Sequence, residues 1–242
     1  MFWNLFYEGL DEIVTYHSRG ALIFCTTLFY VLAFAIPYLL GSVNSAVLIS
    51  HVFYRDDIRN HGSGNAGLTN TLRTYGKKAA LFVLLGDILK TVLAVFIGGL
   101  FVGMRYMGGF SLDWGGFLGA VGCILGHVYP IYYKFKGGKG VLCTATAILI
   151  LSPMVFAVLF LVFVIMVGYT KYVSLGSIMS ALLYPVFYNI LFKVWFSAKP
   201  VATPPCAILF AVFIAFFIVY LHRTNIQRLM KGEENRLSFK KR

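Results

Sequence analysis

Charged residues are scarce in this chain of 242 residues. Asp, Glu, Lys and Arg make up 12% of it, about half of the usual share. In contrast, 59% of the residues are hydrophobic, and the mean hydropathy is +0.79. Such a composition excludes a soluble globular domain. Most of the few charges lie between long apolar runs rather than within them, which predicts an all-α polytopic membrane protein.

Long polar stretches, cysteine motifs and repeats are also lacking. A soluble domain needs about 50 residues or more, and no polar stretch comes near that length. Cys25, Cys123, Cys143 and Cys206 show no CxxC spacing and lie in or beside apolar runs. We therefore expect small buried hydrophobes rather than disulfide partners or metal ligands. No internal repeat is visible.

The N-terminus lacks the basic segment that opens a secretory signal. Its charged residues are Glu8, Asp11, Glu12 and Arg19, and several aromatic residues precede them. We expect residues 1–20 to form an uncleaved extension outside the cytoplasm, lying at the membrane interface.

Seven apolar segments predict seven transmembrane helices. They cover residues 21–50, 79–104, 115–133, 141–151, 154–168, 173–191 and 205–221. The first is long enough to tilt or to break near Gly41 and Ser42. The segments 141–151 and 154–168 are short for a span of about 20 residues, so a tight, partly re-entrant hairpin is an alternative there. The membrane domain is thus expected at 21–221, with a tail at 222–242.

Lys and Arg are distributed unequally between the two sets of connecting segments. Sixteen of the 21 lie in residues 51–78, 129–140, 169–172 and 222–242, and four lie in the opposite set. Cytoplasmic segments carry the excess of basic residues, so the first set is expected in the cytoplasm. This places the N-terminus outside and the C-terminus inside, in agreement with an odd number of spans.

The first polar motif is GSGNAGLTNTLR, residues 62–73. Its three glycines permit a loop with backbone N–H groups turned towards a ligand, and the arginine suits phosphate. We interpret it as an anion-binding loop and name as its ligand-contacting residues Ser63, Gly64, Asn65, Thr69, Asn70 and Arg73. The alternative is a flexible membrane loop.

The second motif is FKGGKG, residues 135–140, at the start of an apolar segment. Lys136, Gly137, Gly138 and Lys139 combine cations with glycine N–H groups at a helix N-terminus, a pattern typical of anion sites. It is not a Walker A loop, because Gly140 rather than Ser or Thr follows Lys139. A basic membrane anchor with turn glycines remains the alternative.

The third motif, HRTNIQRLMKGEE, begins at residue 222. His222 and Asn225 are three residues apart and share one face of a continuing helix, where they could bind and orient a reacting group. The alternative is a basic tail that binds anionic lipid. Ser174 and Ser177 also share a helical face, although small hydroxyl residues often serve helix packing in membranes.

Two further patterns have simpler interpretations. Asp87 and Lys90 lie three residues apart within a predicted span, and we expect a structural ion pair that braces the site. His51 and Asp56 spell HxxxxD, the signature of another acyltransferase group. With five histidines and nine acidic residues in the chain, a chance match carries little weight.

Taken in order, the segments resemble one family, the bacterial acyl-phosphate:glycerol-3-phosphate acyltransferases known as PlsY. They are GSVNSA, DIRNHGSGNAGLTNTLRTYGKK, GDILK, GHVYP with FKGGKGV, KYVSLGS and HRTNIQRLMKGEE. The resemblance covers about residues 37–234. Leu68 stands where the family has Ala, and Leu142-Cys143 stand where Ala-Thr is commoner, which affects substrate fit more than chemistry.

The resemblance implies an enzyme of the bacterial inner membrane with its active site facing the cytoplasm. It implies transfer of an acyl chain from acyl phosphate to the sn-1 hydroxyl of glycerol-3-phosphate, giving lysophosphatidic acid and phosphate. The catalytic residues implied are His222, Asn225, Thr69, Ser174 and Ser177. The partners are the two substrates and membrane lipids, with no nucleic acid, metal or cofactor. A transporter of phosphorylated metabolites and a non-catalytic scaffold are the alternatives.

Overall fold

The computed structural model describes residues 19–105, 112–195 and 205–237, and every regular element in these ranges is a helix. The long helices are α2 (Arg19–Ser42), α5 (Lys77–Arg105), α8 (Pro153–Thr170), α9 (Val173–Trp195) and α10 (Pro205–Leu221). The shorter α-helices are α3 (Ser45–Tyr54), α4 (Leu68–Tyr75), α6 (Phe117–Val128), α7 (Val141–Leu151) and α11 (Arg223–Met230). Single turns occur at η1 (Ile58–Asn60), η2 (Leu112–Gly116) and η3 (Ile131–Tyr133).

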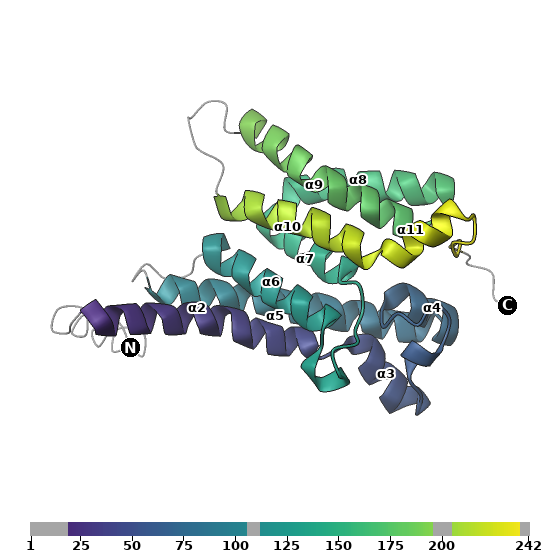
Figure 1. The fold of residues 1–242 in the computed structure, drawn as a ribbon, viewed down its shortest axis with the longest axis horizontal. Coiled ribbons are helices and arrows are strands. Elements are labelled where there is room, and N and C mark those ends of the chain that lie inside the picture. The colour runs from purple at the N-terminus through teal and green to yellow at the C-terminus, as the bar shows by residue number, and fades with distance from the viewer. Residues whose placement is uncertain (1–18, 106–111, 196–204, 238–242) are drawn as a thin grey trace.

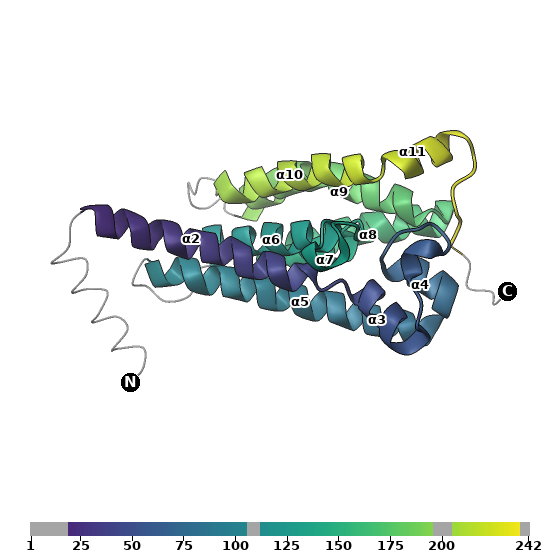
Figure 2. The same ribbon diagram turned by 60° about the horizontal axis from the view of Figure 1, so that its bottom comes forward.

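Two groups of helices lie side by side with α7 between them (Figures 1 and 2). Helices α2, α5 and α6 pack together in one group, and α9 packs against α8 and α10 in the other. Helix α7 contacts α5, α6 and α8. Helices α3, α4 and α11 lie at one end of the molecule, near the α8–α9 turn. Polar segments that are far apart in the sequence therefore meet at this end.

Five helical segments among the described residues are long and apolar enough to cross a membrane, or six if α10 and α11 form one bent span. Each of the seven predicted spans has an apolar helical counterpart, but α7 has only 11 residues and extends about 16 Å, roughly half of a bilayer core. The break expected near Ser42 is confirmed: α2 ends there, and the Asn44 side chain caps α3 by accepting from the N–H groups of Ala46 and Val47. The extension at 1–20 lies almost wholly outside the described residues.

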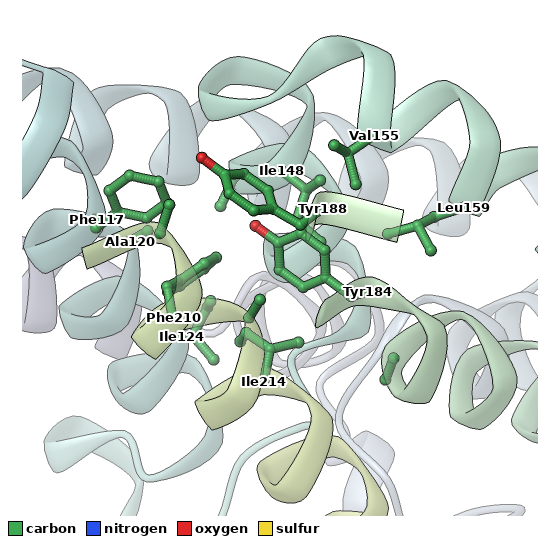
Figure 3. Close-up of a cluster of buried hydrophobic side chains, with 14 of the residues drawn as sticks. Phe117, Ala120, Ile124, Ile148, Val155, Leu159, Tyr184, Tyr188, Phe210 and Ile214 are labelled. Atoms are coloured by element: carbon green, nitrogen blue, oxygen red, sulfur yellow. The ribbon is translucent and has the colours of Figure 1, made fainter. Parts of the chain in front are cut away.

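The apolar core joins the two helix groups (Figure 3). Phe117 and Phe210 pack with ring centroids 5.3 Å apart, and Tyr184 and Phe210 meet edge to face at 6.1 Å. Buried side chains from α6, α7, α8, α9 and α10 complete this cluster. Its aromatic members, Phe117, Tyr184, Tyr188 and Phe210, each bury a large area among smaller aliphatic side chains.

Small residues allow α2 and α6 to approach closely. A Cβ atom on Gly126 would lie 2.1 Å from the backbone oxygen of Tyr38, and one on Gly41 would lie 2.2 Å from that of Cys123. Such contacts are typical of membrane helices, where close packing replaces the hydrophobic effect between helices. Only glycine fits at these two positions without moving the backbone.

Gly126→Ala should therefore lower the stability of the protein by about 1–3 kcal/mol, because the new methyl group meets backbone rather than a mobile side chain. The matched control is Gly168→Ala in α8, where no atom lies within 4 Å of the position that the added Cβ would take and alanine favours the helix by up to about 1 kcal/mol. Denaturation of both variants in a mixed detergent measures the difference. Equal stability of the two variants would contradict the packing argument.

Candidate active site

A cavity of about 410 Å³ lies where the polar segments converge. Its polar lining includes Ser63, Asn65, Thr69, Asn70, Arg73, Lys139, Ser174, Ser177, His222 and Asn225. Its apolar lining includes Ile148, Phe156, Leu159, Phe160, Phe163, Ala181, Ile214 and Ile218. The cavity thus joins a charged region to an apolar chamber between α7, α8, α9 and α10. Ten of the fourteen residues predicted for the site line it.

Asn70 acts as an internal brace of the first loop. Its side-chain amide donates to the carbonyls of Ile58 (3.2 Å) and His61 (2.9 Å), and its oxygen accepts from the Ser63 N–H at 3.0 Å. The prediction that backbone N–H groups of this loop turn towards a ligand is wrong for three of them. Those of Ser63 and Gly67 already have partners within the motif, and that of Gly64 donates to His61 just before it.

Of the second motif, only Lys139 and Gly140 line the cavity among the described residues. The N–H groups of Gly137 and Gly138 donate to the carbonyls of Val128 and His127, both at 3.1 Å, and the Lys136 side chain is exposed. Gly64, Lys136, Gly137 and Gly138 do not line the cavity among the described residues. The two glycines instead permit close packing, since a Cβ on Gly138 would lie 2.2 Å from His127 Nε2.

His222 lies at the bend of 57° between α10 and α11. Its Nδ1 is 2.8 Å from the carbonyl oxygen of Ile218, and because a carbonyl can only accept, Nδ1 carries the hydrogen. Burial and the nearby charge of Lys139 lower the pKa of His222 to about 4. The ring is therefore neutral near pH 7, with Nε2 as an acceptor.

Asn225 connects the second and third motifs. Its side-chain oxygen accepts from Lys139 Nζ, and its nitrogen donates to Glu234 Oε1 at 2.7 Å. Ser174 also donates to this oxygen, at 3.0 Å, whereas Ser177 donates to the carbonyl of Val173 in its own helix. Ser177 thus fits the packing interpretation, and Ser174 belongs to the polar network.

Glu234 and Arg228 are functional candidates that the sequence motifs did not single out. Both line the cavity, and Arg228 Nε lies 2.9 Å from Glu234 Oε2. Burial opposes ionisation of Glu234, but hydrogen bonds from Arg228, Asn225 and Ser174 outweigh it and lower its pKa. An acidic pair in an otherwise basic tail was the signal for this residue.

The segment after α11 crosses the end of the cavity where the polar motifs meet. Arg73 donates to the carbonyl of Asn235 at 3.2 Å, and the N–H of Leu237 donates to the carbonyl of Lys171 at 2.7 Å. The first motif, the α8–α9 turn and the third motif are thereby joined. Arg73, Lys139 and Arg228 supply three cations at this end of the cavity. Glu234 offsets one of them, and Asp87, which also lines the cavity, is paired with Lys90, so the net charge is positive.

A second polar network forms part of the cavity wall, which Asp87 and His127 line. Lys90 Nζ is 2.7 Å from Asp87, which confirms the predicted ion pair, and 2.9 Å from His127 Nδ1. It also donates to the carbonyls of Val43 and Gly41 at 3.1 and 3.3 Å. Asp87 in addition accepts from Ser45 at 2.9 Å. The pair therefore ties α5 to α6 and to the break between α2 and α3.

The described residues also offer one candidate metal cluster. Asp87, His127 and Cys143 have ligand atoms within 4.8 Å of one another. The ammonium group of Lys90 already contacts two of these residues and supplies the positive charge, so the group does not fit a metal site. That the site uses no metal or cofactor stays a prediction.

The HxxxxD pattern does not form an acid–base pair in the structure. His51 Nε2 is 3.7 Å from Asp57 rather than bonded to Asp56, and Asp56 instead pairs with His61 at 2.7 Å. None of these four residues lines the cavity among the described residues. Two departures from the family pattern, Leu68 and Leu142, do line it, as expected for residues that affect substrate fit.

Comparisons with known proteins agree with one another. A family model described as glycerol-3-phosphate acyltransferase matches residues 31–232. Glycerol-3-phosphate acyltransferase 2 of a Bacillus cereus strain is 38% identical over 211 residues, which cover 87% of this chain and 96% of the relative. The glycerol-3-phosphate acyltransferase of Syntrophomonas wolfei is 39% identical over 207 residues, covering 84% and 94%.

Two solved structures have a similar fold. Both are of PlsY, described as an integral membrane glycerol 3-phosphate acyltransferase. The glycerol 3-phosphate form has a TM-score of 0.72 and 32% identity, covering 86% of this chain and 96% of that one. The lysophosphatidic acid form has a TM-score of 0.67 and 31% identity, covering 88% and 95%.

Lys90→Met should destabilise the protein by about 3–5 kcal/mol, because it leaves the Asp87 carboxylate, 1% exposed, without its counter-ion. The double variant Asp87→Asn, Lys90→Met removes both charges and should recover at least half of that loss. Denaturation in detergent measures both. The single variant Asp87→Asn completes the comparison. If the double variant loses as much stability as the two single variants lose together, the two charges are not coupled.

Proposed function

Because the chain belongs to the glycerol-3-phosphate acyltransferase family, we propose that it transfers a fatty acyl chain from acyl phosphate to the sn-1 hydroxyl of glycerol-3-phosphate. The products are lysophosphatidic acid and inorganic phosphate. Membership of the family supports an acyltransferase activity in a membrane. The acyl-phosphate donor and the roles of individual residues are what we propose in addition.

The observation that carries the proposal is the composition of the cavity. Three motifs from distant parts of the sequence bring Arg73, Lys139 and Arg228 to one region, and an apolar chamber continues from it. Two phosphorylated substrates need several cations, and an acyl chain needs apolar walls. A single cavity with both halves suits a reaction between a phosphate ester and an acyl phosphate.

We assign the chemistry to positioning and charge stabilisation. Acyl phosphate carries a good leaving group, so the glycerol hydroxyl can attack its carbonyl carbon directly while the bond to phosphate breaks. Neutral His222 accepts a hydrogen bond from this hydroxyl through Nε2 and orients it, with Asn225 and Thr69 as further polar contacts. A ring with a pKa of about 4 holds a proton less well than the departing phosphate, since even a phosphate ester has a second pKa of about 6. The proton therefore passes to the departing phosphate.

Phosphate binding is assigned to the cations and to the start of α7. Its N-cap residue, Gly140, has a positive φ and forms no side-chain cap, and an unblocked helix N-terminus favours an anion. Lys139 adjoins it, and Arg73 lines the same cavity from α4. Ser63 and Asn65 add neutral donors, whereas the hydroxyl of Ser174 already donates to Glu234.

The proposal includes the membrane arrangement. We place the protein in the bacterial inner membrane with seven spans, the N-terminus outside and the C-terminus inside. The site then faces the cytoplasm, where both phosphorylated substrates are charged and soluble at their head groups. The distribution of Lys and Arg supports this orientation.

An assay of the purified protein with glycerol-3-phosphate tests the donor. We expect lysophosphatidic acid from palmitoyl phosphate and none from palmitoyl-CoA, because the site is proposed to hold a phosphate leaving group. Product from palmitoyl-CoA alone would overturn the donor assignment. Uptake of glycerol-3-phosphate into vesicles without any product would favour the transporter.

The same assay separates the two histidine hypotheses. His222→Ala should lower kcat by about 10²–10⁴-fold, as for the loss of a group that acts on the reacting hydroxyl. The matched control, His51→Ala, changes a residue outside the cavity and should keep nearly full activity. Loss of activity in His51→Ala alone would favour the HxxxxD mechanism.

The pH dependence of kcat/KM for glycerol-3-phosphate tests the role of Lys139. Burial and the charge of Arg228 lower the pKa of Lys139 to about 8, so the free enzyme loses this positive charge as the pH rises through about 8. We expect kcat/KM to fall above that pH, whereas Lys139→Arg, with a pKa above about 12, should remove the decline up to about pH 9.5. The same decline in both proteins would exclude Lys139 as its cause.

A further inference from the structure

One buried hydroxyl in the cavity wall has no hydrogen-bond partner. The Thr144 side chain is 6% exposed and lines the cavity, and its Oγ1 has no partner among the described residues. Ser174, Ser177 and Ser180, which line the same cavity, all donate to protein oxygens. A buried hydroxyl without a partner destabilises a folded protein, so its presence here calls for a ligand.

Thr144 lies between the two halves of the cavity. Gly140, Thr144 and Ile148 all line it, and their spacing of four residues places them on one face of α7. Gly140 adjoins the cation Lys139 at the helix N-terminus, and Ile148 belongs to the apolar chamber. Thr144 is one turn from each, about 6 Å along the helix axis. It therefore lies where the polar head of an acyl donor gives way to its chain.

We propose that the hydroxyl of Thr144 donates a hydrogen bond to the carbonyl oxygen of the acyl donor. This inference rests on the proposed function and adds a catalytic residue to that reaction. As the glycerol hydroxyl attacks the carbonyl carbon, negative charge develops on the carbonyl oxygen, and the hydrogen bond stabilises it. The bond to phosphate then breaks, the substrate proton leaves with the phosphate, and Thr144 keeps its own proton.

The side-chain chemistry of threonine permits this contact. In a helix, threonine divides between two χ1 rotamers, and rotation between them brings either its hydroxyl or its methyl group to the cavity side. In many helices the hydroxyl bonds to the carbonyl one turn back, as Thr146 does to Leu142 at 3.0 Å. Thr144 has not formed this bond, so its hydroxyl can turn to the substrate without breaking another.

The test compares Thr144→Val with Thr144→Ser and Thr146→Val in the full-length protein, using palmitoyl phosphate and glycerol-3-phosphate. Thr144→Val keeps the shape and removes the hydroxyl, and we expect kcat to fall at least about tenfold. The KM for glycerol-3-phosphate and the thermal unfolding temperature should not worsen, because no bond within the protein is lost. Thr144→Ser should restore kcat to within about threefold.

Thr146→Val is the matched control. It removes a hydroxyl from the same helix that is equally buried but does not line the cavity among the described residues. We expect a lower unfolding temperature and unchanged kcat, the opposite of Thr144→Val. An unchanged kcat in Thr144→Val, or a loss accompanied by a lower unfolding temperature and not restored by serine, would overturn the proposal.

An infrared measurement observes the contact itself. A palmitoyl phosphonate labelled with ¹³C at its carbonyl cannot react, and its carbonyl stretch should lie lower when bound to the wild type and to Thr144→Ser than to Thr144→Val. Equal frequencies in all three would also overturn the proposal. The donor assignment can fail separately: if palmitoyl-CoA proves to be the donor, Thr144→Val should slow that reaction, since the same carbonyl reacts.

Discussion

A single ammonium group joins the helices on which the cavity is built. Lys90 contacts Asp87 within α5, His127 at the end of α6, and two carbonyls at the break between α2 and α3. In an apolar surrounding these groups have no water as an alternative partner, so each one's position is set by the others. Asn44, which caps α3 just after the break, also donates to the carbonyl of Ala66 in the first motif at 3.3 Å. The buried charges thereby help to fix the position of the first motif at Ala66.

The polar end of the cavity is assembled through Glu234. Without a negative group, Lys139, Arg73 and Arg228 would repel one another across a partly buried space. The carboxylate, 6% exposed in its side chain, offsets part of this charge and bonds directly to Asn225, Ser174 and Arg228. Enough positive charge remains for a phosphate. Glu234 and Asn235, which follow α11, are thus part of the site's wall rather than of a solvated tail.

The sequence permitted prediction of the apolar segments to within a few residues, because composition alone decides which stretches can be buried in lipid. Residues 205–221 and 141–151, for example, form α10 and α7.

The sequence also indicated which motifs would meet, since their charges placed them on one side of the membrane. It could not show that the glycines of the second motif use their N–H groups to bind α6, or that Asn70 braces its own loop. These roles depend on which backbone atoms the fold places next to each residue, and a local sequence pattern does not predict that. Glu234 was missed because its role depends on three partners, Ser174, Asn225 and Arg228, which the fold brings to its carboxylate.

The position of Phe160 has a consequence for how a lipid substrate would enter the chamber and how a lipid product would leave it. Its side chain lines the apolar chamber and is nevertheless 53% exposed, so the chamber is only partly closed at this position. If the chamber holds the acyl chain, as proposed, a reactant would enter from the surrounding leaflet past this ring, and a product with one acyl chain would leave by the same route. Neither would then have to pass through water, and the rate of exchange would depend on the fluidity of the membrane.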